Sequence, residues 1–153
     1  MTTPEERITE LGLTLPEVAA PVASYAPTVR SGDHVYVSGQ LPLVKGELAA
    51  KGKVGAEVTP ETAQELAAVC ALNAIAAVRA EIGELSKVVR VVKVGGYVAS
   101  TPDFTGQPGV VNGASDLLVR VFGDAGVHAR AAVGVAALPL DAPVGIEMIV
   151  EVR

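Results

Sequence analysis

Apolar side chains recur along this chain with the two periods that are typical of helices and strands. The clearest helical pattern begins at Pro60, with Thr59 placed to cap the first turn, and ends near Gly83. Its apolar stripe recurs every three or four residues and consists of Ala71, Ile75, Val78 and Ile82. The many alanines of this stretch predict that the helix lies close against a sheet.

Residues of alternating polarity predict the strands of that sheet. The expected elements, in chain order, are a helix over 4–13, strands over 25–30 and 34–38, the long helix, a strand over 87–100, a helix over 110–122, and strands over 128–139 and 145–152. The strand over 87–100 is apolar on both faces, which places it centrally, and Gly95-Gly96 predicts a bulge or a close backbone approach. The fold class is therefore α+β, with two helices packed on one face of a mixed sheet.

The stretch 128–139 places a lone arginine at the head of an otherwise small and apolar run. One face of this strand would carry Arg130, Ala132, Gly134 and Ala136. We expect that face to lie opposite the two helices, beside Glu147 and Ile149, and to contact other copies of the chain because it is too apolar to meet water. A buried guanidinium needs an anion, although Arg130 could also reach water or pair with a carboxylate of its own chain.

The composition indicates one domain, part of whose surface is covered by another subunit. The 153 residues are 50% hydrophobic and 19% charged, and this is a small number of charges for the surface of a monomer. We expect a single domain over 1–153, in which 1–24 form an N-terminal helix and an extended arm. The net charge of −5 argues against a nucleic-acid partner, because phosphate binding needs a basic surface.

Cys70 is the single cysteine of the chain, which excludes an intrachain disulfide and fits a reducing compartment. We expect its thiol to be buried and unreactive. No apolar run is long enough to span a membrane, so we expect a cytoplasmic protein. No metal site is expected at His34 or His128, which lack acidic or cysteine partners at metal spacing. Ser115 and Asp116 are expected on a solvated helix face.

Three blocks of residues carry a resemblance to a known family. The first joins Ser24–Pro27 to Val35–Gln40, the second is Val111–Gly113, and the third runs from Arg130 through Leu138-Pro139 to Ile146-Glu147. On these blocks the chain resembles the YjgF/RidA family of reactive-intermediate (imine or enamine) deaminases, also called L-PSP endoribonuclease-like proteins. The resemblance implies a fold like that of trimeric chorismate mutase, with sheets facing inward in a homotrimer and active clefts between subunits.

The resemblance also implies roles for individual residues. Arg130 would hold the carboxylate of a small-molecule substrate, and Glu147 would be the second catalytic residue. The positions that would contact substrate in the same cleft are Tyr25, Ser38, Gly39, Asn112 and Ala132. Ala132 stands where the family often has a cysteine. No cofactor and no metal ion are implied.

The implied chemistry is hydrolysis of a 2-imino acid to a 2-keto acid and ammonia. The imine is already electrophilic, so the protein needs an arginine fork for the carboxylate and a group such as Glu147 that orients or deprotonates water.

Three alternatives stay open. Glu147 could form a structural ion pair with Arg130, Tyr25 could pack in an interface, and the trimer could bind a carboxylate metabolite or a protein without catalysis. A ribonuclease is less favoured, because the chain is acidic and poor in aromatic residues.

Overall fold

The computed structural model describes residues 2–21 and 23–153; Met1 and Val22, which belong to the predicted segment 1–24, lie outside the described residues. The elements in chain order are α1 (Pro4–Glu10), β1 (Thr28–Ser31), β2 (His34–Gln40), β3 (Leu43–Val44), β4 (Glu47–Leu48), α2 (Pro60–Ile82), the short turn η1 (Leu85–Lys87), β5 (Val88–Ala99), α3 (Gln107–Phe122), η2 (Gly123–Gly126), β6 (Ala129–Val135), η3 (Pro139–Asp141) and β7 (Val144–Val152). No helix in the described part of the chain combines the length and apolar character that crossing a membrane requires.

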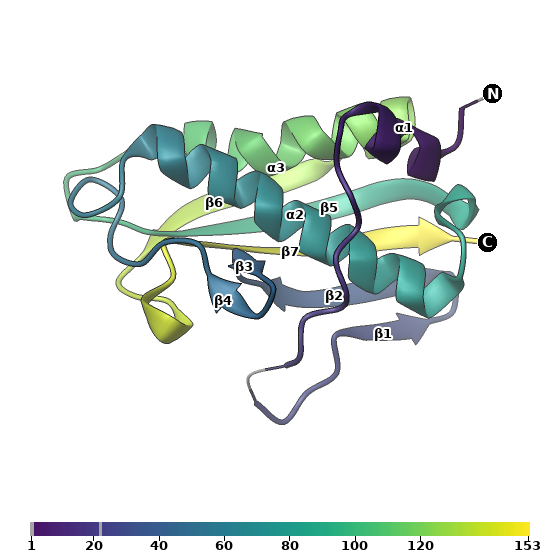
Figure 1. The fold of residues 1–153 in the computed structure, drawn as a ribbon, viewed down its shortest axis with the longest axis horizontal. Helices are drawn as coiled ribbons and strands as arrows, with labels where there is room; N and C mark the ends of the chain where they lie inside the picture. The colour runs from purple at the N-terminus through teal and green to yellow at the C-terminus, as the bar shows by residue number, and fades with distance from the viewer. Residues whose placement is uncertain (1, 22) are drawn as a thin grey trace.

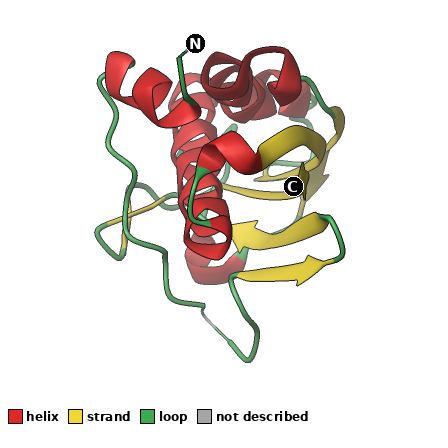
Figure 2. Cartoon of the chain, turned by 90° about the vertical axis from the view of Figure 1, so that its right-hand side faces the viewer, coloured by secondary structure: helices red, strands yellow, loops and turns green. Residues whose placement is uncertain are grey.

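Five of the strands form one mixed sheet. Their order is β1-β2-β7-β5-β6, and β3 and β4 form a separate ribbon. Neighbouring strands of the large sheet are antiparallel except β5 and β6, which run parallel and are connected through α3. Helices α2 and α3 lie on the same side of this sheet (Figures 1 and 2). The predicted α+β class, with a mixed sheet and two helices on one face, is confirmed.

The long helix follows the predicted pattern. Thr59 caps α2 by accepting a hydrogen bond from the Thr62 amide at 3.1 Å, and Pro60 takes the first helical position. Helix α3 begins at Gln107, earlier than predicted. The reason is that Pro108 falls in the first turn, where a backbone N–H has no partner within the helix, so a proline is tolerated there.

Helices α2 and α3 approach each other closely at Gly113. A Cβ atom at this position would lie 1.9 Å from the backbone oxygen of Gln64 in α2, so any side chain would push the helices apart. Asn112, the preceding residue, would move with α3. The glycine therefore fixes the height of α3 above the sheet and, with it, the position of the Asn112 amide.

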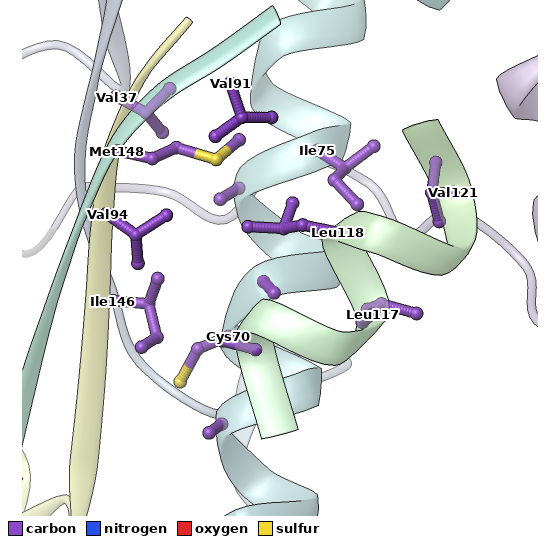
Figure 3. Close-up of a cluster of buried hydrophobic side chains, with 14 of the residues drawn as sticks. Val37, Cys70, Ile75, Val91, Val94, Leu117, Leu118, Val121, Ile146 and Met148 are labelled. Carbon is purple, nitrogen blue, oxygen red and sulfur yellow. The ribbon is translucent and has the colours of Figure 1, made fainter. Parts of the chain in front are cut away.

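The core fills the space between this helix pair and the sheet. Figure 3 shows strand side chains, among them Val37, Val94, Ile146 and Met148, facing Ile75 of α2 and Leu118 of α3. Cys70 lies in the same layer with no exposed surface, as predicted, and its Sγ lies 3.7 Å from the Val144 backbone oxygen. Burial raises the pKa of the Cys70 thiol far above its ordinary value, so the thiol is protonated and inert.

The short helix α1 is attached to the helix layer by two charged side chains. Glu5 accepts a hydrogen bond from the Leu85 amide at 2.9 Å, and Arg7 donates to the Val121 backbone oxygen at 3.3 Å. Helix α1 ends at Glu10, before its predicted end. The chain from α1 to β1 then crosses over α2 in Figure 1, so the N-terminal segment runs from the helix layer to the edge of the sheet.

The opposite face of the sheet is exposed in the single chain and carries large apolar side chains beside charged ones such as Lys93. Val29, Tyr36 and Val133 are 57%, 48% and 45% exposed there. Val29 pairs with Tyr36, and Tyr36 pairs with Ile149. The side chains of Val29, Tyr36 and Ile149 therefore form one row across β1, β2 and β7. We call this surface the open face. Its character agrees with the expectation that the second face of the sheet is too apolar for water.

Candidate functional site

Arg130 lies near the start of β6, an edge strand, and is half-buried against the first half of α3. Its Nη1 donates to Asn112 Oδ1 at 2.7 Å and to Ser115 Oγ at 3.2 Å, and its Nη2 donates to the Pro108 backbone oxygen at 3.3 Å. All three acceptors are neutral. Among residues 2–21 and 23–153, Arg130 forms no ion pair and its Nε donates no hydrogen bond. The guanidinium therefore keeps both its charge and one donor edge for an anion.

Glu147 and Arg130 lie on opposite faces of the sheet. Residues that pair directly in neighbouring strands point to the same face. Arg130 pairs with Val94, and Val94 pairs with Met148, whose side chain is buried beneath the helices. Glu147 instead pairs with Gly95 and points to the open face. The prediction that Arg130 and Glu147 share one face is wrong, and a structural ion pair between them within one chain is excluded.

The other residues of β6 alternate between the two faces of the sheet, so the even-numbered ones share the face of Arg130. Ala132 is half-buried and packs against the core on the side of Arg130. A Cβ at Gly134 would lie 2.8 Å from Nε2 of Gln107 in α3, so this glycine also faces the helices. Ala136 lies beyond the end of β6. The open face thus carries Ala131 and Val133 instead of the residues expected there, because α3 packs over the even-numbered positions of the strand.

Glu147 forms a hydrogen-bonded pair with Tyr97 of the neighbouring strand β5. The Tyr97 hydroxyl donates to Glu147 Oε1 at 2.5 Å. This bond, with smaller contributions from burial and from the negative charge of Glu147, raises the pKa of Tyr97 above its ordinary value. Gly95 leaves room for the pair, since a Cβ there would lie 2.9 Å from Oε1. Of the two features predicted at Gly95-Gly96, the bulge is absent, since register shifts in β5 occur nearer its start, and the close approach is confirmed, since a Cβ at Gly96 would lie 2.5 Å from Val111 Cγ2.

Two hollows meet at Tyr97. The first, about 480 Å³ in volume, is on the open face and is lined by Tyr36, Ser38, Tyr97 and Glu147 among others. The second, about 220 Å³, is lined mostly by apolar residues and includes Tyr25, Gly39 and the Leu138-Pro139 turn. The Ser38 hydroxyl donates to the Ala26 backbone oxygen at 2.6 Å, which ties β2 to the segment before β1.

The residues expected in one cleft therefore fall into two groups within a single chain. Tyr25, Ser38 and Gly39 lie around the hollows on the side of Glu147. Asn112 contacts Arg130 on the helix side. Ala132 shares the face of Arg130 and lines neither hollow.

The model of a protein family described as YjgF/chorismate mutase-like matches residues 5–152. The chain belongs to the YjgF/RidA family. It is 44% identical over 144 residues to protein TCP17 of Trypanosoma cruzi, covering 94% of this chain and 90% of that protein. The crystal structure of protein Atu1372 from Agrobacterium tumefaciens matches with a TM-score of 0.92 and 50% identity over 98% of this chain and 92% of that one. RidA from the Antarctic bacterium Psychrobacter matches with a TM-score of 0.61 and 28% identity, covering 89% and 94% of the two chains.

Family membership confirms the resemblance and the chorismate mutase-like fold, but three residues near the site were not predicted. Tyr97 is two positions after Gly95 in β5 and so faces the same side of the sheet. Ser115 was expected on a solvated surface, yet it is half-buried and bonded to Arg130; Asp116 beside it is exposed as expected. His128 lies 2.8 Å from Ser115 Oγ through its Nε2.

The spacing between Asn112 and Ser115 is the signal by which the serine could have been found. Residues three apart occupy the same face of a helix, so a helix that presents Asn112 to Arg130 must present Ser115 as well. His128 is two positions before Arg130 and so would share its face of the strand predicted over 128–139. In the described part of this YjgF/RidA chain, no group of three His, Cys, Asp or Glu side chains could hold a metal ion.

Proposed function

We propose that this chain is a hydrolytic deaminase of reactive 2-imino acids and their enamine tautomers, releasing 2-keto acids and ammonia. The observation that carries the proposal is the state of Arg130. Three neutral oxygens hold its guanidinium, and no carboxylate of the described residues neutralises it. A half-buried arginine in this state is suited to a small carboxylate ligand.

The guanidinium offers a two-pronged edge to such a ligand. Nη1 uses both hydrogens on Asn112 and Ser115, and Nη2 uses one of its two on Pro108. The Nε hydrogen and the second Nη2 hydrogen remain to hold a carboxylate in the bidentate geometry that arginine favours. The imino carbon next to that carboxylate would then be fixed relative to the protein.

Glu147 is the group that we assign to the water molecule. Tyr97 occupies Oε1, so Oε2 is the oxygen that would accept a proton from water as the water adds to the imino carbon. Glu147 passes this proton to the imino nitrogen. The second proton of the added water follows by the same route as the C–N bond breaks, so the nitrogen leaves as ammonia and a 2-keto acid remains. The step needs no oxidant and no cofactor.

Arg130 and Glu147 point to opposite faces of one sheet, so a shared cleft requires two copies of the chain. We propose that the assembly is a homotrimer in which the open face of one subunit meets the edge strand β6 of the next. The apolar open face and the low charge content, 19%, support this assembly. Tyr25, Ser38 and Gly39 would then belong to the subunit that supplies Glu147, and Asn112 to the subunit that supplies Arg130.

The second candidate is a trimer of the same form that binds a small carboxylate metabolite without catalysis. The bond between Tyr97 and Glu147 favours it, since a carboxylate held this closely by a hydroxyl could serve structure alone. We expect either protein in the cytoplasm, in keeping with a single reduced cysteine, and without a nucleic-acid partner.

The test is the release of 2-keto acid from imines generated in situ by an amino-acid oxidase. Several parent amino acids are compared, with and without the protein, and the rate of spontaneous hydrolysis is subtracted. We expect a clear acceleration for some imines. Calorimetric binding of the 2-keto acid products without acceleration of any imine would contradict the deaminase and support the binding protein.

A further inference from the structure

A chain of hydrogen bonds runs from Arg130 into the protein on the side away from its open donor edge. Arg130 Nη1 donates to Ser115 Oγ at 3.2 Å, Ser115 Oγ lies 2.8 Å from His128 Nε2, and His128 Nδ1 lies 2.6 Å from the Gly126 backbone oxygen. From this geometry we propose that Ser115 and His128 act as a positioning pair for Arg130. The inference rests on the proposed function, in which Arg130 holds the substrate carboxylate.

The direction of these hydrogen bonds follows from the last acceptor. A backbone oxygen only accepts, so Nδ1 of His128 carries the hydrogen that faces Gly126. In the neutral ring Nε2 then has the lone pair, and the Ser115 hydroxyl donates to it. With its hydrogen directed at His128, the Ser115 oxygen turns its own lone pairs toward Arg130. Each bond strengthens the next, because a hydroxyl that donates is a better acceptor.

The three side chains come from different segments. Ser115 belongs to α3, Arg130 to β6, and His128 to the short connection after η2. Strand β6 has only one neighbour in the sheet, so its register alone does not fix a long side chain. Asn112 and Ser115, three residues apart on one helix face, both accept from Nη1 and so set the plane of the guanidinium. His128 holds the serine in the rotamer that this requires.

A positioning role predicts a particular kinetic effect. If Arg130 holds the carboxylate equally in the ground and transition states, a loosened guanidinium weakens substrate binding and leaves the chemical step alone. Because neither side chain touches the substrate, removing one of these hydrogen bonds should raise KM only roughly threefold to tenfold and change kcat by less than about twofold. Ser115→Ala and His128→Leu should each show this pattern. Ser115→Thr, which keeps the hydroxyl, should restore KM to near the wild-type value.

The double variant separates action through the serine from an independent role of the histidine. If His128 acts only through Ser115, the variant with both Ser115→Ala and His128→Leu should have the KM of Ser115→Ala alone. Asp116→Ala, next to Ser115 but exposed, is the matched control on α3 and should match wild type. Additive effects of the two substitutions, a fall in kcat instead of a rise in KM, or no rescue by threonine would overturn the proposal.

A measurement that needs no turnover keeps this inference distinct from the proposed function. NMR of the arginine guanidinium groups, with the Arg130 signal assigned through Arg130→Lys, reports rotation about its Nε–Cζ bond. We expect slow rotation in wild type and in Ser115→Thr, and faster rotation in Ser115→Ala and His128→Leu. Equal rotation in all four proteins would refute the positioning pair. Restricted rotation in a protein that accelerates no imine would refute the deaminase alone.

Discussion

The two faces of the sheet differ more than any other two regions of this molecule. On the helix side, Val94, Ile146 and Met148 are at most 2% exposed and meet a layer built from alanine, valine, leucine and isoleucine. On the open face, Tyr36 is 48% exposed and Glu147 lies in a hollow beside Tyr97. The first face is completed by its own chain. The second exposes large apolar side chains beside polar ones such as Lys93 and Glu147, and no element among the described residues covers it, which supports the proposed contact with another subunit.

The residues of the candidate site are likewise divided between the two faces of the sheet. Arg130 lies on the helix side, at the edge strand where the core ends, and Glu147 lies in the middle of the open face. Neither group neutralises the other within one chain. In the proposed deaminase, this division would keep both a cationic and an anionic group free for the ligand, and activity would depend on assembly.

The largest effect is expected from a charge on the open face. Tyr36→Glu would place a carboxylate between Val29 and Ile149, and burying it in a subunit interface without a partner costs several kcal/mol, roughly. We expect dissociation to monomers at micromolar concentration and loss of deaminase activity, measured by light scattering and keto-acid release. Val119→Glu, at an equally exposed apolar position on α3, is the control and should stay trimeric. A trimeric Tyr36→Glu protein would show that the open face is not the interface.

The next largest effect concerns Glu147. Glu147→Gln keeps the shape and the acceptor for Tyr97 but removes the base, so kcat should fall by about 10²-fold or more while KM changes little. Tyr97→Phe keeps the base and loses only its hydrogen bond, so its loss of kcat should be smaller. Steady-state kinetics with circular dichroism as the folding control measures both. Full kcat in Glu147→Gln would remove the general base from the mechanism.

Arg130→Lys should have an intermediate effect, and it should raise KM instead of lowering kcat. Lysine keeps the positive charge but cannot contact Asn112 and Pro108 while presenting two parallel donors to a carboxylate. Charge-assisted hydrogen bonds are worth about 1.5–3 kcal/mol, so KM should rise roughly tenfold to a hundredfold. If the lysine variant binds and turns over its substrate like wild type, Arg130 is not the carboxylate site.

The smallest effect is expected from Cys70→Ala, which tests the burial of Cys70 on the helix side of the sheet. Burial raises the pKa of the Cys70 thiol, so at alkaline pH the folded protein keeps the proton that the unfolded chain loses. Stability should therefore fall as pH rises above about 8.5, by up to ~1.4 kcal/mol per pH unit more in wild type than in Cys70→Ala. Urea unfolding at several pH values measures the difference. Equal pH dependence in both proteins, or rapid thiol labelling of the native state, would contradict a buried Cys70.

The sequence predicts most of the fold because its elements have clear polarity contrasts. Strand β7 shows its period over many residues, and its buried face is as predicted. The stripe predicted for α2 is buried, together with most of the rest of that helix, and its capping residues mark where it starts. Strand β6 is different. One face carries Arg130, Ala132 and Gly134 and the other carries alanine and valine, so the pattern favours burial of the valine face, which the structure leaves open. Only the packing of α3 over the strand decides this, and Gly113, which permits that packing, contacts a residue far away in the sequence.

The site, too, could be predicted only in part from the sequence. Arg130, Asn112 and Glu147 were named from the family resemblance, and the structure brings the first two together. The hydrogen bonds of Tyr97 and His128 could not be predicted, because each joins side chains of different elements. The division of the site between two faces was also hidden, since it depends on the phase of β6 relative to β7.

We propose above that each cleft takes Arg130 from one subunit and Glu147 from another. Subunits carrying Arg130→Ala and subunits carrying Glu147→Gln, each with its own affinity tag, are co-expressed and purified through both tags. Every mixed trimer then has one intact cleft, so at a substrate concentration near the wild-type KM we expect about a third of the wild-type rate from two nearly inactive parents. Mixed trimers no more active than the better parent, with wild-type subunits active under the same tags, would contradict it.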